Sequence, residues 1–271
     1  MIAFPNSKIN LGLHILQKRT DGFHNLETIF YPVALQDALE IIQNPLPQST
    51  EIEFTTTGLE IDTAENICIK TYQILKKDFP QLPSIKLHLH KLIPLGAGLG
   101  GGSADGTFSL ILLNKKFNLG LSEQQLIDYA LKLGSDCPFF IKNTPCFATN
   151  RGEILQEISL NLSNYKIVLV NPQIHINTAW AFSKIKPDNS RISLQEIIQQ
   201  PVTEWKHVLK NDFEDIVFNE YPEIQNIKEK LYQKGAAYTS MSGSGSTVYG
   251  IFERNMQLEF DFPGHYFIKN V

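Results

Sequence analysis

The stretch PLGAGLGGGSADGTFSLILLN, residues 94–114, decides the fold of this chain. Five of the seven residues from Gly96 to Gly102 are glycine, and an apolar segment follows from Ser103. The residues before it, IKLHLH at 85–90, alternate between apolar and polar side chains as a β-strand does. Because ordering so much glycine costs conformational entropy, a loop of this kind is expected to serve a purpose.

A strand, a glycine-rich turn and a helix that starts at Ser103 together predict a phosphate site. The first turn of a helix has unpaired backbone N–H groups and a partial positive charge. Glycines let a ligand approach such a backbone closely, and the usual ligand is an anion such as phosphate. The Ser103 hydroxyl is a candidate for a hydrogen bond to phosphate or for binding Mg²⁺. A flexible surface loop is the alternative, but flexible linkers rarely lie between a strand and a buried helix.

Two common nucleotide motifs do not account for the loop. The pattern GxxxxGK[ST] is absent, because no lysine follows the glycines. The dinucleotide pattern GxGxxG fits by letter at Gly96, Gly98 and Gly101. However, the loop follows several antiparallel-looking strands, and no acidic residue ends a strand about 20 residues later, as that motif requires.

Composition limits the classes of protein to consider. The chain has 271 residues, 42% of them apolar and 19% charged, which is typical of a soluble globular protein with one or two domains. Its formal net charge of −4 argues against a nucleic-acid partner. Three cysteines without a CxxC spacing argue against disulfides or a zinc site. No apolar run approaches a membrane span and no signal peptide is evident, so we expect a cytoplasmic protein without a membrane partner.

The remaining patterns predict a mixture of strands and helices. Alternating or β-branched runs predict strands at 9–16, 27–33, 38–43, 51–57, 84–90, 166–170, 236–241 and 246–252. Helices are expected at 65–79, 103–117, from Ser122 onward, and over much of 178–234. Ser122 and Gln125 have capping-box spacing, and 151–153 reads as a turn between strands. A domain change is expected somewhere within 150–165.

The glycine stretch resembles the signature of the GHMP kinases, which phosphorylate small alcohols with ATP. Their motif reads roughly P-x-x-x-G-L-G-S-S-A, and Pro94, Gly98, Leu99 and Gly100 match it. The GGGS at 100–103 departs from the general form. It is similar to the branch of the family that phosphorylates 4-diphosphocytidyl-2-C-methyl-D-erythritol, where GLGGGS is usual.

Four further segments are similar to that branch. They are PNSKINLGLHIL at 5–16, RTDGFHNLET at 19–28, GSDCPFF at 134–140 and MSGSGSTVYGIF at 241–252. Together these motifs cover nearly the whole chain. The combination of DGFH, GLGGGS and SDCPFF is specific to the branch, although none of the three would be specific alone.

The resemblance implies an α+β fold with the two domains of a GHMP kinase. A ribosomal-protein-S5-like N-terminal domain at 1–155 would bind ATP, and an α+β C-terminal domain at 156–271 would bind the substrate. The expected cofactors are ATP and Mg²⁺, with Ser103 as a candidate metal ligand. The residues implied in ATP binding are Pro94, Leu95, Gly96, Ala97, Gly98, Leu99, Gly100, Gly101, Gly102, Ser103 and Ala104.

Lys8 and Asp136 are the catalytic residues that the resemblance implies. Asp136 would orient and deprotonate the substrate hydroxyl. Lys8 would keep Asp136 ionised and stabilise negative charge on the γ-phosphate. From the sequence pattern alone, a turn aspartate and a solvated surface lysine are the simpler interpretations.

The cytidine diphosphate group of the implied substrate has a flat ring with a polar edge. We expect Phe23 to stack on cytosine, His24 to hydrogen-bond its edge, and Phe182 to complete the sandwich. The branch often has Tyr where Phe23 stands, so here stacking survives without a hydroxyl. Phe182 in the core is the alternative.

Four further residues are candidates for substrate binding. Asn10 shares a strand face with Lys8, with a strand-edge asparagine as the alternative. Thr178 is either a substrate contact or a helix N-cap. Ser242 and Gly243 belong to a turn, 242–245, that is expected near the phosphate loop, with a plain hairpin turn as the alternative.

Two other sets of polar residues receive simpler interpretations. Asp105 is either a residue that supports the site from behind or an acid of the first helical turn, favoured by the helix dipole; we prefer the latter. The histidines show no metal-binding spacing, and His88 and His90 share a strand face without evident partners.

Two other functions stay open at this point. One is another GHMP kinase acting on mevalonate, homoserine or a sugar, for which the DGFH segment and Phe182 would have no purpose. The other is a GHMP-fold binding protein without catalysis, for which Lys8 and Asp136 would be unnecessary. The chain is expected to act as a monomer or weak homodimer.

Overall fold

The computed structural model describes residues 1–45, 51–63 and 66–271. These residues divide into two compact units, and each unit is built from separate stretches of the chain. Unit 1 contains Met1–Ser7, Ala34–Leu95 and Gly100–Thr144, and unit 2 contains Lys8–Val33, Gly96–Leu99 and Pro145–Val271. The assignment of ATP binding to 1–155 and of substrate binding to 156–271 stays a prediction.

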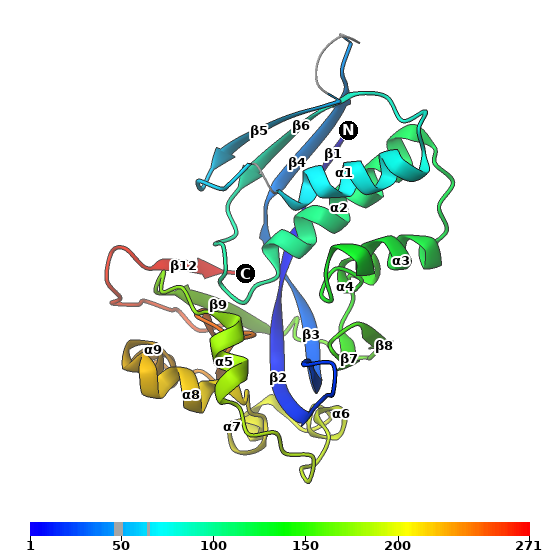
Figure 1. Ribbon diagram of the computed structural model, residues 1–271. Coiled ribbons are helices and arrows are strands. Elements are labelled where there is room, and N and C mark those ends of the chain that lie inside the picture. Colours follow the sequence, from blue (N-terminus) through cyan, green and yellow to red (C-terminus); the bar gives the residue numbers. More distant parts are fainter. Residues whose placement is uncertain (46–50, 64–65) are drawn as a thin grey trace. The chain divides into compact units, whose positions relative to one another are not determined.

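Unit 1 is a four-stranded sheet with helices on one face (Figure 1). The strand order is β1 (Ile2–Ala3), β4 (Ala38–Gln43), β6 (Ile85–Lys91) and β5 (Ile52–Gly58). β4 and β6 are antiparallel, and β5 is parallel to β6. The helices are α1 (Ile67–Asp78), α2 (Gly101–Phe117), α3 (Glu123–Leu133) and the short α4 (Phe139–Lys142).

The core of unit 1 explains why these segments form. Alternate residues of β6, Ile85, Leu87 and Leu89, are buried and pack with Leu110 and Leu113 of α2. Burying apolar area at roughly 25 cal/mol per Å² is the main favourable term for such a layer. The opposite face of β6 carries His88 and His90, which pair with Thr55 and Thr57 of β5 at 2.8–3.0 Å. The prediction that these histidines lack partners is therefore wrong, because the parallel neighbour β5 supplies hydroxyl groups.

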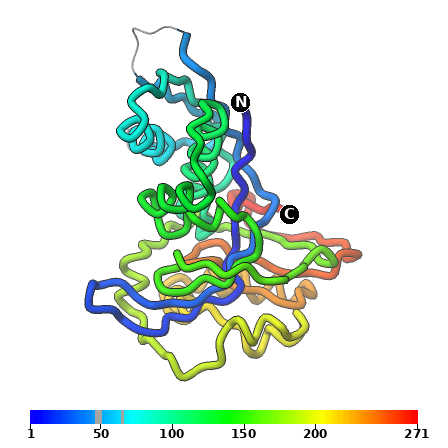
Figure 2. The backbone as a smooth tube through the Cα atoms, turned by 90° about the vertical axis from the view of Figure 1, so that its right-hand side faces the viewer, coloured from blue at the N-terminus to red at the C-terminus, as the bar shows by residue number. Residues whose placement is uncertain are grey.

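Unit 2 contains two further sheets. One has the order β2 (Asn6–Lys18), β3 (His24–Gln36), β7 (Cys146–Asn150) and β8 (Ile154–Glu157), and the first residues of β2 and the last of β3 belong to unit 1. The long β2–β3 hairpin can be followed in blue in Figure 2. The other sheet has the order β10 (Tyr238–Met241), β11 (Val248–Glu253), β9 (Tyr165–Asn171) and β12 (Phe267–Asn270).

Helices of unit 2 lie between β9 and β10 in the sequence. They are α5 (Thr178–Lys184), α6 (Leu194–Ile197), the 3₁₀ helix η1 (Val202–Glu204), α7 (Trp205–Val208), α8 (Phe213–Glu220) and α9 (Pro222–Gln233). α9 packs on β10 and β11, burying Ile224, Ile227 and Leu231, three residues at helical spacing. No helix among residues 1–45, 51–63 and 66–271 is long and apolar enough to cross a membrane.

Most expected elements are present, with shifted ends. The strand expected at 9–16 runs from Asn6 to Lys18, and the strand expected at 236–241 begins at Tyr238. The capping box of α3 at Ser122 and Gln125 is confirmed, and Arg151-Gly152-Glu153 does connect β7 to β8. The expected helix at 65–79 is α1, but Glu65 lies outside the described residues.

Candidate functional site

The helix after the glycine loop begins earlier than predicted. α2 starts at Gly101, with Gly100 as its N-cap in the left-handed region, so Ser103 is its third residue and the predicted start at Ser103 is wrong. Gly100 has a φ of +69°, which glycine adopts without strain, and Gly101 and Gly102 form the first helical residues. No described side chain caps this turn. Its N–H groups therefore suit an anion.

The surface of this first turn is open at one position. A Cβ added to Gly102 would meet nothing within 4 Å, whereas one added to Gly101 would lie 2.7 Å from Ile93 Cγ2. Gly101 is thus required by packing inside unit 1, but Gly102 is not. The glycine at 102 leaves the backbone accessible to a ligand.

The Ser103 side chain lies half-buried beside the thiol of Cys137, and Thr107 Oγ1 donates to the Cys137 carbonyl at 3.0 Å. Burial raises the pKa of the Cys137 thiol to about 11, so it stays a thiol at neutral pH. Among residues 1–45, 51–63 and 66–271, no group of three or more His, Cys, Asp or Glu side chains is arranged to hold a metal ion.

The middle of the glycine loop belongs to unit 2 and contacts the turn at 242–247. Ser242 Oγ donates to the Gly98 carbonyl at 2.8 Å, and a Cβ on Gly98 would collide with the Ser242 carbonyl. Gly98 has a φ of +76°, so it is required both for backbone conformation and for this close approach. The prediction that the 242–245 turn packs near the glycine loop is confirmed, and the binding of phosphate there stays a prediction.

Lys8 and Asn10 lie on one buried face of β2. Lys8 is 4% exposed, and its Nζ donates to Asn10 Oδ1 at 2.6 Å. The ammonium also lies 4.8 Å from the centroid of the Phe30 ring. Lys8 is therefore not a solvated surface lysine. A buried cation of this kind needs acceptors or anions around it.

Asn10 links β2 to its neighbours. Its Nδ2 donates to Thr28 Oγ1 at 2.9 Å, and its backbone N–H donates to Ser242 Oγ at 3.2 Å. Tyr249 Oη donates to the Asn10 carbonyl at 2.8 Å. Ser242 therefore contacts both the strand that carries Lys8 and the glycine loop, although all of these residues are far apart in the sequence.

Asp136 belongs to unit 1, in the turn between α3 and α4. It is half-buried, and its carbonyl accepts from Phe139 N at 3.3 Å, which closes the turn. The simpler interpretation, a turn aspartate, therefore describes its backbone. Lys8 belongs to unit 2, so the pairing of the two side chains stays a prediction.

The structure brings together two of the three residues assigned to the cytosine ring. The His24 imidazole and the Phe182 ring are stacked, with centroids 5.1 Å apart and planes 24° apart. Phe182 also packs edge-on against Phe213 at 4.9 Å, so it contacts the core of unit 2 as well. Burial, with the charge of Lys18, lowers the pKa of His24, which favours a neutral ring.

Phe23 lies against a different partner, which sequence reasoning missed. The Arg151 guanidinium lies 5.0 Å from the centroid of the Phe23 ring, and Phe23 is 54% exposed. Arg151 Nε donates to Glu153 Oε1 at 3.1 Å. The sequence placed Arg151 only in a turn, and nothing in the motif pointed to its cation–π contact.

The loop that carries Phe23 is held by its own arginine. Arg19 donates to Asp21 from Nη2 at 2.9 Å and from Nε, which is shared between the two carboxylate oxygens at 3.0 and 3.1 Å. It also donates to Asn25 and Asn150. Phe23 N donates to Asp21 Oδ1 at 3.1 Å. The conformation of the RTDGFH segment is therefore set by a local network rather than by the core.

Thr178 is not the N-cap of its helix. Asn177 caps α5, because its side chain accepts from Trp180 N at 2.9 Å. Thr178 Oγ1 lies 2.9 Å from Ser244 Oγ, in the 242–245 turn. The N-cap alternative is wrong, and the hydroxyl of Thr178 faces the same turn as Asn10.

Asp105 is part of a buried charged cluster, which the sequence did not reveal. The Lys91 Nζ lies 2.7 Å from Asp105 Oδ2 and 2.5 Å from Asp37 Oδ2. Asp105 lies beyond the first turn of α2, so the preferred interpretation, a first-turn acid favoured by the helix dipole, is wrong. Its partner is a lysine 14 residues earlier on β6.

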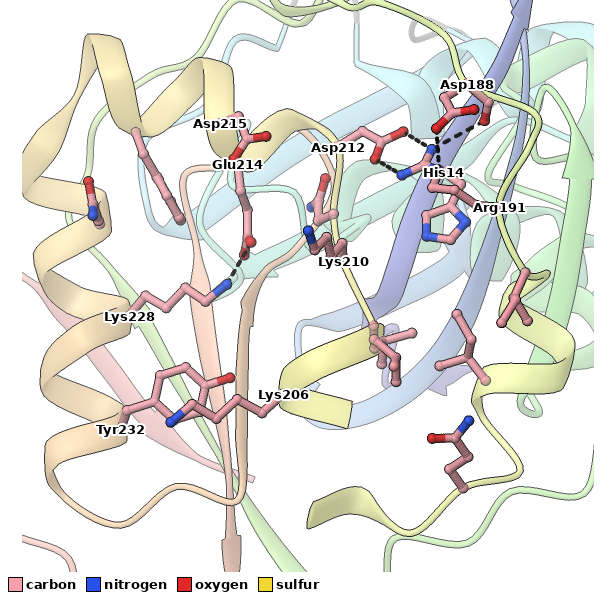
Figure 3. Close-up of a pocket in the computed structure, with 18 of the residues that line it drawn as sticks. His14, Asp188, Arg191, Lys206, Lys210, Asp212, Glu214, Asp215, Lys228 and Tyr232 are labelled. Carbon is pink, nitrogen blue, oxygen red and sulfur yellow. Dashed lines mark hydrogen bonds and ion pairs between the residues drawn. The ribbon is translucent and has the colours of Figure 1, made fainter. Parts of the chain in front are cut away.

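A separate cavity of about 810 Å³ lies within unit 2 (Figure 3). Figure 3 shows Arg191 and Asp212 pointing toward one another, and Lys228 pointing toward Glu214. These pairs are 2.6–2.7 Å apart. His14, which also lines the cavity, pairs with Glu27 at 3.1 Å. None of the described lining residues is a predicted site residue, and its main charges neutralise one another.

Comparison with known proteins identifies the family. The model of the GHMP kinases N terminal domain matches residues 66–143, and that of the GHMP kinases C terminal matches residues 193–260. A 4-diphosphocytidyl-2-C-methyl-D-erythritol kinase of Bacteroides fragilis is 52% identical over 96% of both chains. One of Azobacteroides pseudotrichonymphae is 50% identical over 99% of this chain and 100% of its own.

Solved structures support the same assignment. A crystal structure of 4-(cytidine 5'-diphospho)-2C-methyl-D-erythritol kinase superposes with a TM-score of 0.79 at 27% identity, covering 93% of this chain and 90% of that one. A mevalonate kinase superposes with a TM-score of 0.73 at 13% identity over 100% and 98%, which shows the shared fold alone. The expected α+β GHMP kinase fold is confirmed. The chain belongs to the GHMP kinase family, within its group of 4-diphosphocytidyl-2-C-methyl-D-erythritol kinases.

Proposed function

We propose that this protein transfers the γ-phosphoryl group of ATP to the 2-hydroxyl of 4-diphosphocytidyl-2-C-methyl-D-erythritol, in the non-mevalonate route to isoprenoid precursors. The relatives at 50–52% identity carry the name of this kinase. The observation that supports it most directly in this chain is the contact of His24 with Phe182. A substrate with a nucleobase can stack on such an aromatic pair, whereas mevalonate, homoserine and galactose have no ring of that kind.

The glycine loop is the proposed phosphate site. The uncapped first turn of α2 supplies N–H donors, and Gly102 leaves them open. Phosphoryl transfer needs positioning and charge neutralisation more than covalent chemistry. The buried Lys8 ammonium is the proposed source of positive charge for the γ-phosphate.

Asp136 is the proposed base for the substrate hydroxyl. A carboxylate can act as a general base when it lies within hydrogen-bond reach of the proton that it takes. Asn10, Ser242, Gly243 and Thr178 are proposed to contact the substrate, because they meet around the 242–245 turn. Phe23 is proposed to cover the second face of cytosine.

Mg²⁺ is proposed to neutralise the charge of the triphosphate. The donor set that this chain offers at the loop is the single hydroxyl of Ser103. Mg²⁺ commonly keeps several waters and binds through substrate phosphates with one or two protein oxygens. The residues present therefore fit an ion that enters bound to ATP. We further propose that the enzyme acts in the cytoplasm, as a monomer or weak homodimer.

A coupled assay of ADP release tests the proposed function. ATP and Mg²⁺ are supplied with the cytidine substrate, and in parallel with mevalonate, homoserine or galactose. We expect turnover with the cytidine substrate alone. Turnover with another alcohol would reject the assignment of the DGFH segment, and no turnover with any of them would favour a non-catalytic binding protein.

Gly102→Ala tests the phosphate site separately. Alanine is a better helix former than glycine by about 1 kcal/mol, and its Cβ meets no atom of the protein. The variant should therefore be at least as stable as the parent, but its KM for ATP should rise by about tenfold or more. Gly264→Ala, where a Cβ likewise meets nothing, is the matched control. An unchanged KM for ATP in Gly102→Ala would contradict the phosphate site.

A further inference from the structure

Three buried charged side chains in unit 1 connect the segments on either side of the glycine loop. We call these two segments, the end of β6 with residues 92–93 and the start of α2, the stems of the loop. Lys91 is the last residue of β6, before the loop, and Asp105 lies in α2, after it. Asp37 lies between β3 and β4. All three side chains are at most 3% exposed, and Lys91 Nζ contacts a carboxylate oxygen of each aspartate, at 2.5 Å and 2.7 Å.

The cluster also holds the backbone that leads into the loop. Asp37 Oδ1 accepts from Leu92 N at 2.6 Å and from Ile93 N at 2.9 Å. Pro94 and the glycines follow directly. Asp37 therefore fixes the first stem with one oxygen and binds Lys91 with the other.

The second stem is packed against the same groups. A Cβ on Gly101 would lie 3.1 Å from Lys91 Nζ and 2.7 Å from Ile93 Cγ2. Four residues later, the Asp105 carboxylate receives a hydrogen bond from Lys91. The start of α2 is thus positioned by contact at Gly101 and by the hydrogen bond from Lys91 to Asp105.

The stability of the folded protein does not by itself explain why such a charged cluster is present. Removing charges from water costs several kcal/mol per ion, and well-packed apolar side chains are often as stable. What the ionic arrangement adds is directional contact: one ammonium must satisfy two carboxylates at once, which fixes the spacing of the elements that carry them. Here those elements are the two stems of the loop.

We propose that Lys91, Asp37 and Asp105 form a clamp that positions the glycine loop for ATP, without touching the nucleotide themselves. The proposal rests on the proposed function, in which this loop binds the phosphates. Asp105 connects α2 to the first stem through Lys91, so cutting that connection widens or loosens the loop. The effect falls on ATP and not on the cytidine substrate.

Two substitutions at Asp105 both introduce a neutral side chain. Comparing them separates the effect of the hydrogen bond to Lys91 from the effect of losing the negative charge. Asp105→Asn keeps an oxygen that can accept from Lys91, and Asp105→Ala does not. Both leave Lys91 paired with Asp37, so neither buries an unpaired charge. We expect Asp105→Ala to raise the dissociation constant of ATP by about tenfold or more, and Asp105→Asn to change it by less than about threefold.

Lys91→Arg is the second variant, in case Asp105→Ala does not fold. It keeps the cation but replaces a compact ammonium with a larger planar group. We expect a rise of at least about threefold in the dissociation constant of ATP. Lys228→Met, which breaks the pair of Lys228 with Glu214 at 2.6 Å in unit 2, is the control and should leave ATP binding unchanged.

The measurements are calorimetric binding of ATP, and KM for ATP and for the cytidine substrate, on variants shown to be folded by circular dichroism. Equal effects of Asp105→Ala and Asp105→Asn would overturn the proposal. So would equal rises in both KM values, since these indicate a general loss of structure. Calorimetry needs no alcohol substrate, so the clamp is still tested if turnover with the cytidine substrate fails. If the parent protein does not bind ATP at all, both proposals are rejected.

Discussion

The rings of His24 and Phe182 are stacked at a centroid distance of 5.1 Å, although the two residues are 158 positions apart in the chain. His24 begins β3 and Phe182 lies in α5. Both are in unit 2, so the fold of this unit alone forms the aromatic pair. The pair is the basis of the first two predictions.

Phe182→Ala should weaken binding of the cytidine substrate. Stacking of a base on an aromatic side chain is worth about 1–3 kcal/mol, and each 1.4 kcal/mol is about a tenfold change in affinity. We expect the KM for the cytidine substrate to rise by about tenfold or more, while the KM for ATP changes by less than about twofold. Phe182→Tyr, which keeps the ring, is the control. Steady-state kinetics with each substrate varied in turn is the measurement, and parallel rises in both KM values would contradict the assignment.

His24 should titrate below the ordinary imidazole pKa of 6.5. Burial disfavours its charged form and the charge of Lys18 repels it, so its pKa is lowered. Because the folded pKa lies below the unfolded one, its contribution to stability is present above about pH 6.5 and falls as the pH drops toward the folded pKa. A titration followed by NMR on the imidazole measures the midpoint. Lys18→Gln should move the midpoint upward, and a midpoint above 6.5 in the parent protein would be inconsistent with this environment.

Asp136→Asn should remove most of the turnover. General base catalysis contributes about 10²–10⁴-fold, so we expect kcat to fall by at least about 100-fold with little change in either KM. The substitution is nearly isosteric, and the residue lies in a turn that its backbone closes. Thermal unfolding should therefore be unchanged, which serves as the control. Full turnover in this variant would exclude Asp136 as the base.

Asp105 should make stability depend on pH near neutrality. Burial raises its pKa to about 7, against the stabilising charge of Lys91. The protonated form is thus favoured by folding, so this contribution is largest at low pH and is lost as the pH rises from about 4 through 7. Asp105→Asn cannot lose a proton. Urea unfolding gives the free energy of unfolding at pH 5 and at pH 8. Between these two pH values, the parent protein should lose at least about 1 kcal/mol more of this free energy than the variant does. The same pH dependence in both proteins would refute the raised pKa of Asp105.

Asn211→Ala should destabilise unit 2. Asn211 Nδ2 donates to the carbonyl groups of Met241 and Gly243 at 2.7 and 2.8 Å, and the residue is 3% exposed. Losing two buried hydrogen bonds costs about 2 kcal/mol. The exposed Asn161, which accepts from Ser163 N at 2.8 Å, is the matched control, and Asn161→Ala should cost less than about 1 kcal/mol. Urea unfolding of both variants gives the comparison, and equal losses would argue against this role for Asn211.

Local patterns were sufficient to predict much of the fold. The alternation of Ile85, Leu87 and Leu89 identified β6, and Ser122 with Gln125 identified the start of α3. The positions of Lys8 and Asn10 two residues apart on a strand placed them on one face, where they are hydrogen-bonded. These features depend on residues close together in the chain, so short-range rules apply to them.

The predictions that are wrong concern side chains whose role depends on a partner far away in the sequence. The sequence favours a helix-dipole role for Asp105, because its partner Lys91 belongs to another element and only the fold brings them together. Thr178 was a candidate N-cap, but Asn177 has the geometry to accept from Trp180 N, and Thr178 reaches Ser244 instead. His88 and His90 seemed unpartnered only because the sequence does not show that β5 runs parallel beside β6.

The sequence by itself determined the family, the glycine loop and the identities of the chemical groups, because these depend on residue types at fixed spacing. Only the tertiary structure decided which groups meet: Lys91 with Asp37 and Asp105, Phe23 with Arg151, and Ser242 with both Gly98 and Asn10. The physical reason is that hydrogen bonds and ion pairs act over about 3 Å, and the chain brings such partners together only by folding its sheets and helices around a core.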